Sequence, residues 1–137
     1  VFEIFCAAYW IVMFVTDKQR KTFGSTLYLE LQYCIHKGAS VKNLFAKNTV
    51  EHWRDDSIYI CVDDMHLFYS EYGEIFGKSN YKVGLKNIDM FGINYYNATQ
   101  TRSIINKIEE QKPCDYKILL DWLKCAQADN GFYILGL

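Results

Sequence analysis

Apolar residues fill the first fifteen positions of the chain almost without a break. A continuous run of this kind has neither the two-residue period of a half-buried strand nor the 3.6-residue period of an amphipathic helix. Residues 2–15 are therefore a core element whose type stays open between helix and buried strand, although the length favours a helix. The polar stretch DKQRKT that follows predicts an exposed break between two elements.

Residues 25–38 place their larger apolar side chains at helical spacing, namely Leu27, Leu31, Cys34 and Ile35. Ser25 or Thr26 can cap the start of a helix and Gly38 suits its exit, so we expect a helix here. Shorter helices are expected at 40–45 and 50–53.

The segment SIYICV, residues 57–62, is the clearest strand, because β-branched and aromatic residues follow one another in it. Asp63 or Asp64 can then cap a helix that runs through Phe76, with one apolar face made of Met65, Phe68, Tyr72, Ile75 and Phe76. A β-hairpin that turns at Asp63-Asp64 is the alternative. Residues 78–87 form a loop that carries lysines.

Alternating apolar positions predict a strand at 90–96, with Phe91, Ile93 and Tyr95 on one face. Asn97 and Gln100 have the spacing of a capping box and open a helix that Pro113 stops. Asp115 can cap the next helix, whose stripe is Tyr116, Leu119, Leu120 and Leu123. Asn130-Gly131 ends that helix, and FYILGL closes the chain as a strand.

This order of elements predicts the fold class α+β, with a small, mainly antiparallel sheet packed against several helices. A length of 137 residues suits one domain, so we assign residues 1–137 to a single domain. Half of the residues are hydrophobic, and the chain contains one proline and no linker-like stretch, which argues against long disordered segments.

Composition also bears on location. The apolar start is shorter than the ~20 residues of a spanning helix and contains Glu3, and no basic residues precede it, so we expect no membrane association. The five cysteines are widely spaced and form no C-x-x-C pair. We expect most of them to be buried free thiols, which suits the reducing cytoplasm.

One stretch, YGEIFGKSNY at residues 72–81, looks at first like a phosphate-binding loop. The motif requires four residues between its two glycines, whereas Gly73 and Gly77 enclose three, and Glu74 would oppose a phosphate. We therefore expect no nucleotide site. Gly77 is expected to end a helix instead.

Asp63 and Asp64 at the exit of a strand are the most enzyme-like feature. Two carboxylates there could hold a magnesium ion for phosphoryl transfer, with His66 as a nearby base. The other interpretation is that one aspartate caps a helix and the other is solvated. We expect no metal and no other cofactor, and a Mg²⁺-dependent phosphoryl-transfer enzyme that uses Asp63 and Asp64 is kept as the alternative function.

Charge is unevenly distributed along the chain. Residues 51–74 hold seven acids and one base, a net charge of −6, while the rest of the chain carries +5 and the total is −1. Aromatic residues are interleaved with these acids. Such a segment suits a surface for a basic protein partner, since aromatic side chains act as anchors and acids steer the encounter. The other interpretation is a solvated face whose aromatic residues all point inward.

The stretch FGINYY and the later DYKILLDWLKCAQADNGFYILGL give the chain a resemblance to the immunity proteins of bacterial contact-dependent growth inhibition and related polymorphic toxin systems. The resemblance covers about residues 58–137 and lies in the style of the sequence, because these families share no invariant motif. It implies a cytoplasmic, non-enzymatic protein that binds one cognate toxin, often a nuclease, and blocks its active site.

The sequence therefore predicts an immunity protein that neutralises a basic toxin, with a nuclease as the expected type, and that does not bind nucleic acid directly. Its oligomeric state is left open. The contact residues that we predict are Asp55, Asp56, Asp63, Asp64, Tyr69, Glu71 and Glu74.

Overall fold

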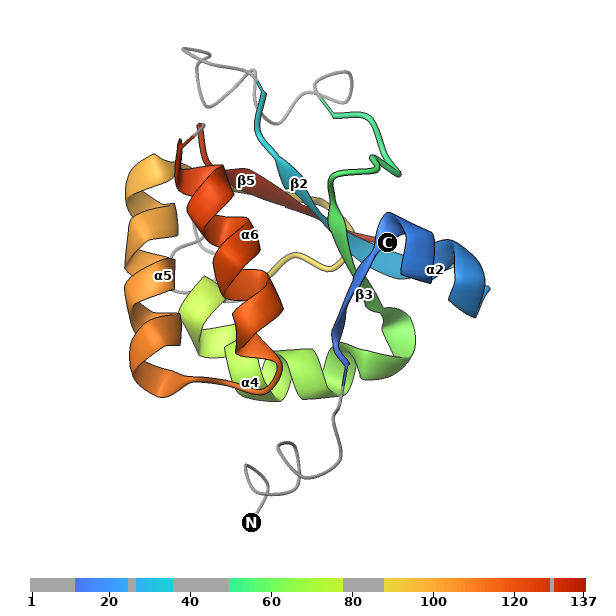
Figure 1. Cartoon of the computed structure of the whole chain (residues 1–137), viewed down its shortest axis with the longest axis horizontal. Coiled ribbons are helices and arrows are strands. Elements are labelled where there is room, and N and C mark those ends of the chain that lie inside the picture. The colour runs from blue at the N-terminus through green and yellow to red at the C-terminus, as the bar shows by residue number, and fades with distance from the viewer. Residues whose placement is uncertain (1–11, 25–26, 36–49, 78–87, 129) are drawn as a thin grey trace.

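The computed structural model describes residues 12–24, 27–35, 50–77, 88–128 and 130–137 (Figure 1). Its strands are β1 (Phe14–Thr16), β2 (Tyr28–Tyr33), β3 (Ile58–Cys61), β4 (Ile93–Tyr96) and β5 (Phe132–Leu135). Its helices are α2 (Asp17–Phe23), α4 (Met65–Gly77), α5 (Ala98–Gln111) and α6 (Tyr116–Ala128), and the 3-10 turn η1 (Val62–Asp64) leads into α4. The α+β class is confirmed.

The five strands form one sheet in the order β1-β3-β2-β5-β4, and every neighbouring pair is antiparallel. β2 is the central strand, and it pairs with β3 on one side and with β5, about a hundred residues later in the chain, on the other. The predicted antiparallel sheet is thus confirmed.

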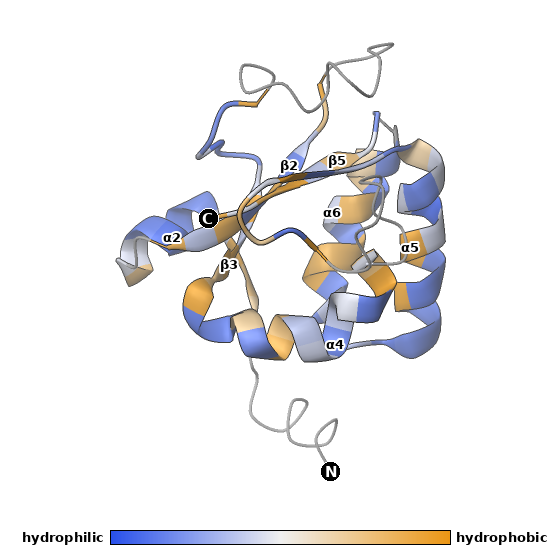
Figure 2. Cartoon of the chain, turned by 180° about the vertical axis from the view of Figure 1, so that it is seen from behind, coloured by the Kyte–Doolittle hydropathy of each residue, from blue (hydrophilic) through white to orange (hydrophobic). Residues whose placement is uncertain are grey.

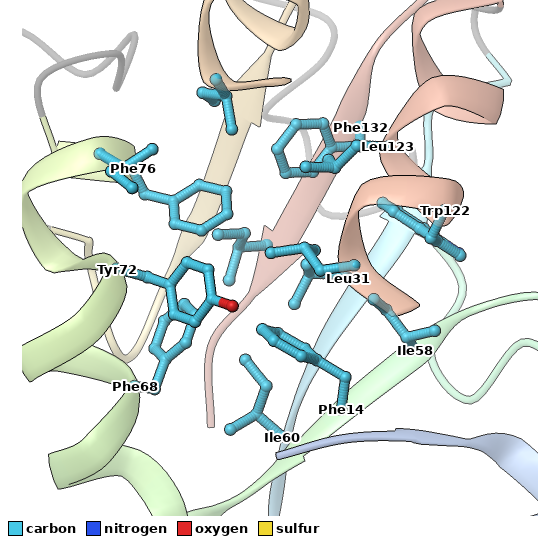
Figure 3. Packing of buried hydrophobic residues seen from close by; sticks show 14 of the residues in the cluster. Phe14, Leu31, Ile58, Ile60, Phe68, Tyr72, Phe76, Trp122, Leu123 and Phe132 are labelled. Atoms are coloured by element: carbon cyan, nitrogen blue, oxygen red, sulfur yellow. The ribbon is translucent and has the colours of Figure 1, made fainter. Parts of the chain in front are cut away.

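Helices α4, α5 and α6 cover one face of this sheet (Figure 1). Leu31, Ile58 and Phe132 point from the strands toward Phe68 and Leu123 on the helices (Figure 3). Each helix has an apolar stripe against the sheet and polar residues outside, which gives α5 its two colours in Figure 2. This is the main hydrophobic core.

The opposite face of the sheet is rich in tyrosine and polar side chains. Residues that lie opposite each other on neighbouring strands point to the same face of the sheet. The strand pairing therefore assigns to this face Val15, Tyr28, Glu30, Gln32, Tyr59, Tyr95, Tyr133 and Leu135. All of them are buried. α2 packs over β1 and β3 at one end of this face.

Several local predictions are confirmed. β3 and β5 lie where they were expected, and α4 ends at Gly77 with its predicted apolar face buried. The capping box of α5 is present: the Asn97 side chain accepts from the Gln100 amide at 2.8 Å, and the Gln100 side chain accepts from the Asn97 amide at 2.9 Å.

The helix predicted at 25–38 is wrong, because this segment contains β2. A central strand is buried on both faces, so apolar and polar residues alternate in it without an exposed side. Leu27 and Ile35, which the helical stripe required in the core, are more than half exposed. The helical spacing of the leucines was thus misleading.

Other predictions also need correction. The stretch DKQRKT is not a break but lies in α2, which Thr16 and Gln19 open with their own capping box. Residues 50–53 form no helix. At Asp63-Asp64 the chain forms η1 and then the preferred helix α4, and not the alternative hairpin. Phe91 lies outside β4 and is 80% exposed.

The carboxylate of Asp115 accepts the amides of Met13 and Phe14 at 2.8 and 3.0 Å. It therefore anchors the start of β1 to the loop before α6, a role that the capping prediction did not foresee. Burial raises the pKa of this carboxyl. The predictions for residues 2–11, 40–45 and 78–87 lie outside the described residues.

Candidate protein-binding surface

The predicted contact residues occupy three places and do not form one ridge. Asp55 and Asp56 lie in the turn before β3, whereas Asp63 and Asp64 lie in η1 after it. Because β3 is extended between the two pairs, they stand roughly 20 Å apart. The remaining three, Tyr69, Glu71 and Glu74, are on α4.

Two of the residues on α4 are engaged in contacts within the protein. The Tyr69 hydroxyl donates to the Ile88 carbonyl at 3.1 Å, and the Glu71 carboxylate accepts the Cys114 amide at 2.8 Å. Both side chains are half-buried, whereas Glu74 is exposed. Tyr69 and Glu71 thus hold α4 to its neighbours.

Asp63 is exposed and Asp64 is half-buried. Burial, and to a lesser extent the neighbouring charge of Asp63, raises the pKa of Asp64. His66 is exposed one residue after the start of α4. Among the described residues, no group of three or more His, Cys, Asp or Glu side chains is placed to hold a metal ion.

The segment before β3 is built around a buried carboxylate that the sequence analysis missed. Glu30 lies on β2, is 1% exposed, and accepts the amides of Trp53 and Arg54 at 2.7 and 3.1 Å. The hydroxyl of Ser57 donates to it at 2.7 Å, and the side-chain amide of Gln32 donates to it at 3.1 Å. A buried charge of this kind costs stability unless it is hydrogen-bonded, and here it fixes residues 51–57, which we call the Trp53 loop.

Trp53 stands out in this loop. Its backbone has a φ of 67°, an uncommon conformation for a bulky residue, and its side chain is 46% exposed. A large, exposed aromatic residue held in a strained backbone conformation is typical of functional sites.

The ring of Trp53 contacts two side chains of the protein, Tyr59 and Arg20. It stacks on Tyr59 with centroids 5.9 Å apart, and the Arg20 guanidinium lies 4.4 Å from its centroid. Arg20 in turn pairs with the Asp17 carboxylate, and this hydrogen bond lowers the pKa of Asp17. The positive charge next to Trp53 is thus already paired.

One acid of the loop is held by an ion pair. Asp55 and Asp56 are exposed, and Asp56 pairs with Arg54 at 3.2 Å. The carbonyl of Asp56 accepts the indole N–H of Trp122 on α6 at 3.0 Å. The loop therefore exposes the indole ring of Trp53 and the carboxylates of Asp55 and Asp56 from a hydrogen-bonded backbone.

Two further findings concern the cysteines and the possibility of a membrane-spanning helix. Cys34, Cys61 and Cys125 are free as expected, but of these three only Cys34 is buried. Cys114 is disulfide-bonded, so the expectation of a free thiol is wrong for that residue. In the described part of the chain, no helix combines the length and the apolar character that a membrane crossing requires.

The buried Glu30 carboxylate thus supports a loop that exposes the strained Trp53 together with Asp55 and Asp56. Comparison with protein families, with curated proteins and with solved structures finds no match to this chain.

Proposed function

We propose that this protein is an immunity protein that binds a cognate toxin domain, a basic nuclease, and neutralises it by occlusion. The observation that carries the proposal is the Trp53 loop, in which an exposed indole stands beside exposed acids on a backbone fixed by Glu30. Tryptophan is among the residues that contribute most to protein–protein affinity, and a pre-organised loop loses little entropy on binding.

The proposed mechanism is steric and electrostatic. Asp55 and Asp56 would face the Lys, Arg or His side chains with which a nuclease holds phosphates. Charges at the rim would mainly raise the association rate, while a buried pair would slow dissociation. Acidic residues repel nucleic acid, so the chain itself is not expected to bind it.

The structure changes the weight of the individual contact residues. Asp55 and Asp56 become central because both are exposed in the same loop as Trp53, although Asp56 also pairs with Arg54. Tyr69 and Glu71 become less suitable, since both are half-buried and bond within the protein. Asp63, Asp64 and Glu74 would reach a partner only if it extended past the far end of β3.

A cytoplasmic location belongs to the same proposal. The disulfide of Cys114 weighs against it, because disulfides persist mainly in oxidising compartments.

The direct test starts by locating a gene for a large exported protein beside the gene for this chain. The C-terminal domain of that protein is then co-expressed with this chain, and the pair is purified at about 50 mM and 500 mM salt. We expect a stoichiometric complex that weakens as salt increases. Failure to form a complex, combined with Mg²⁺ binding that disappears in Asp63→Asn, would instead support the phosphoryl-transfer enzyme.

A further inference from the structure

The surface next to the Trp53 loop is hollowed. His52 lines an open hollow of about 180 Å³ together with residues from β4, β5 and the segments beside them: Phe91, Gly92, Ile93, Leu135, Gly136 and Leu137. Pockets for small-molecule ligands usually measure about 300–1,000 Å³, so this one has the size of a single side chain.

Two large apolar side chains that line the hollow are open to solvent. Phe91 is 80% exposed and Leu137 is 42% exposed, so both side chains are accessible to a partner. The centre of the His52 ring lies 6.3 Å from the centre of the Trp53 ring, so the indole is a neighbour of a residue that lines the hollow.

The charges at the edge of this surface indicate the kind of partner. Glu51, Asp55 and Asp56 are exposed in the loop, and Arg54 offsets one of them by pairing with Asp56. The loop is therefore left with a net charge of −2. Apolar surface bordered by acids is complementary to a basic surface that carries an apolar side chain.

We propose that the Trp53 loop and this hollow form the toxin-facing surface, and that the partner inserts one apolar or aromatic side chain into the hollow while neighbouring basic residues meet Asp55 and Asp56. This inference rests on the proposed function and specifies where and by what chemistry the partner is recognised. It also excludes the exposed side of α4 as the main contact.

A phage-displayed library of random 16-residue peptides provides the probe. The library is selected on the folded full-length chain, and the enriched peptides are synthesised for affinity measurements by isothermal titration calorimetry. We expect the enriched sequences to combine Lys or Arg with an apolar or aromatic residue.

Two variants then locate the binding face. Phe91→Ser removes one wall of the hollow, and it should weaken the selected peptides about tenfold or more, as the loss of an anchoring contact does. Ile118→Ser is the matched control, because Ile118 is also exposed, at 44%, but lies on α6 in the helical layer. The control should bind like the wild type, and both variants should unfold at the wild-type temperature.

The outcomes separate the two proposals. If basic peptides are enriched but Phe91→Ser binds them as well as the wild type does, the proposed surface is wrong and a basic partner remains supported. If no basic peptides are enriched, both the surface and the proposed function are overturned.

Discussion

Buried tyrosine hydroxyls in the core differ in whether they are satisfied. The Tyr72 hydroxyl, which points into the core in Figure 3, donates to the Cys114 carbonyl at 2.6 Å. The Tyr96 hydroxyl is also fully buried, but it has no hydrogen-bond partner among the residues that the structure describes. Burial raises the pKa of both hydroxyls far above the usual value, so both are neutral at any physiological pH.

Removing these two hydroxyls should therefore have different effects on stability. In Tyr96→Phe, no hydrogen bond is lost and the cost of burying an unpaired polar group disappears, so the free energy of unfolding should stay equal or rise by about 1 kcal/mol. In Tyr72→Phe, the Cys114 carbonyl loses its donor, and the free energy of unfolding should fall by about 1–2 kcal/mol. Urea unfolding measures both variants; equal losses would show that Tyr96 has a bonding partner.

At the same scale, some roles were evident from the sequence and others were not. The capping box of Asn97 and Gln100 is a local signal of fixed spacing, so it could be recognised directly. Glu30 bonds to a residue that is 23 positions away in the sequence, and Asp115 bonds to a residue that is about a hundred positions away. No local pattern contains such information.

Among the elements, the Trp53 loop depends most on a single side chain. It has no regular secondary structure, and the backbone amides of Trp53 and Arg54 both donate hydrogen bonds to the Glu30 carboxylate. Without that acceptor, two donors that are now satisfied would lose their partner, and the strained backbone at Trp53 would have no reason to persist.

Glu30→Gln tests this dependence. A glutamine side chain has one carbonyl oxygen, and its NH₂ group would face the donors of the loop, so we expect the free energy of unfolding to fall by about 2–3 kcal/mol. Amide hydrogen exchange at Trp53 and Arg54 should accelerate more than in the strands. Glu109→Gln, on the exposed side of α5, is the control. Unchanged protection of the two amides would show that Glu30 does not hold the loop.

Helices and strands with one buried and one exposed face were predicted more accurately than elements without such a division. α4 and α5 have one apolar and one polar face, and their periodicity identified them correctly. β2 is covered on both faces, so its alternation of leucines with Tyr28, Glu30 and Gln32 carries no polar side, and leucines four residues apart matched a helix by chance. Short polar α2 had no apolar stripe and was missed.

For the molecule as a whole, the clustering of acids in the sequence did not become a cluster in space. The strand β3 passes through the middle of the acidic segment and separates its two aspartate pairs. A sequence segment of uniform charge can therefore serve two different regions of a small domain, and charge along the chain alone could not identify the binding face.

Charge reversal in the complex with the toxin domain distinguishes these regions. Asp55→Lys with Asp56→Lys should slow association about tenfold at low salt and flatten its dependence on ionic strength, because steering acts through charges near the interface. Asp63→Lys with Asp64→Lys changes the net charge equally and should have a much smaller effect. Stopped-flow measurements at several salt concentrations provide the rates, and equal slowing by both pairs would contradict the assignment.

The sheet order has a consequence for how the chain acquires its structure during synthesis. β5 lies between β2 and β4, so β2 has one unpaired edge and β4 has no strand partner until residues 132–135 have left the ribosome. Pairing over such a separation in sequence is slow, because the loop must close before any contact repays its entropy. The growing chain therefore exposes the edge of its central strand throughout translation of everything before β5, and a chaperone that shields strand edges would act on it in that interval.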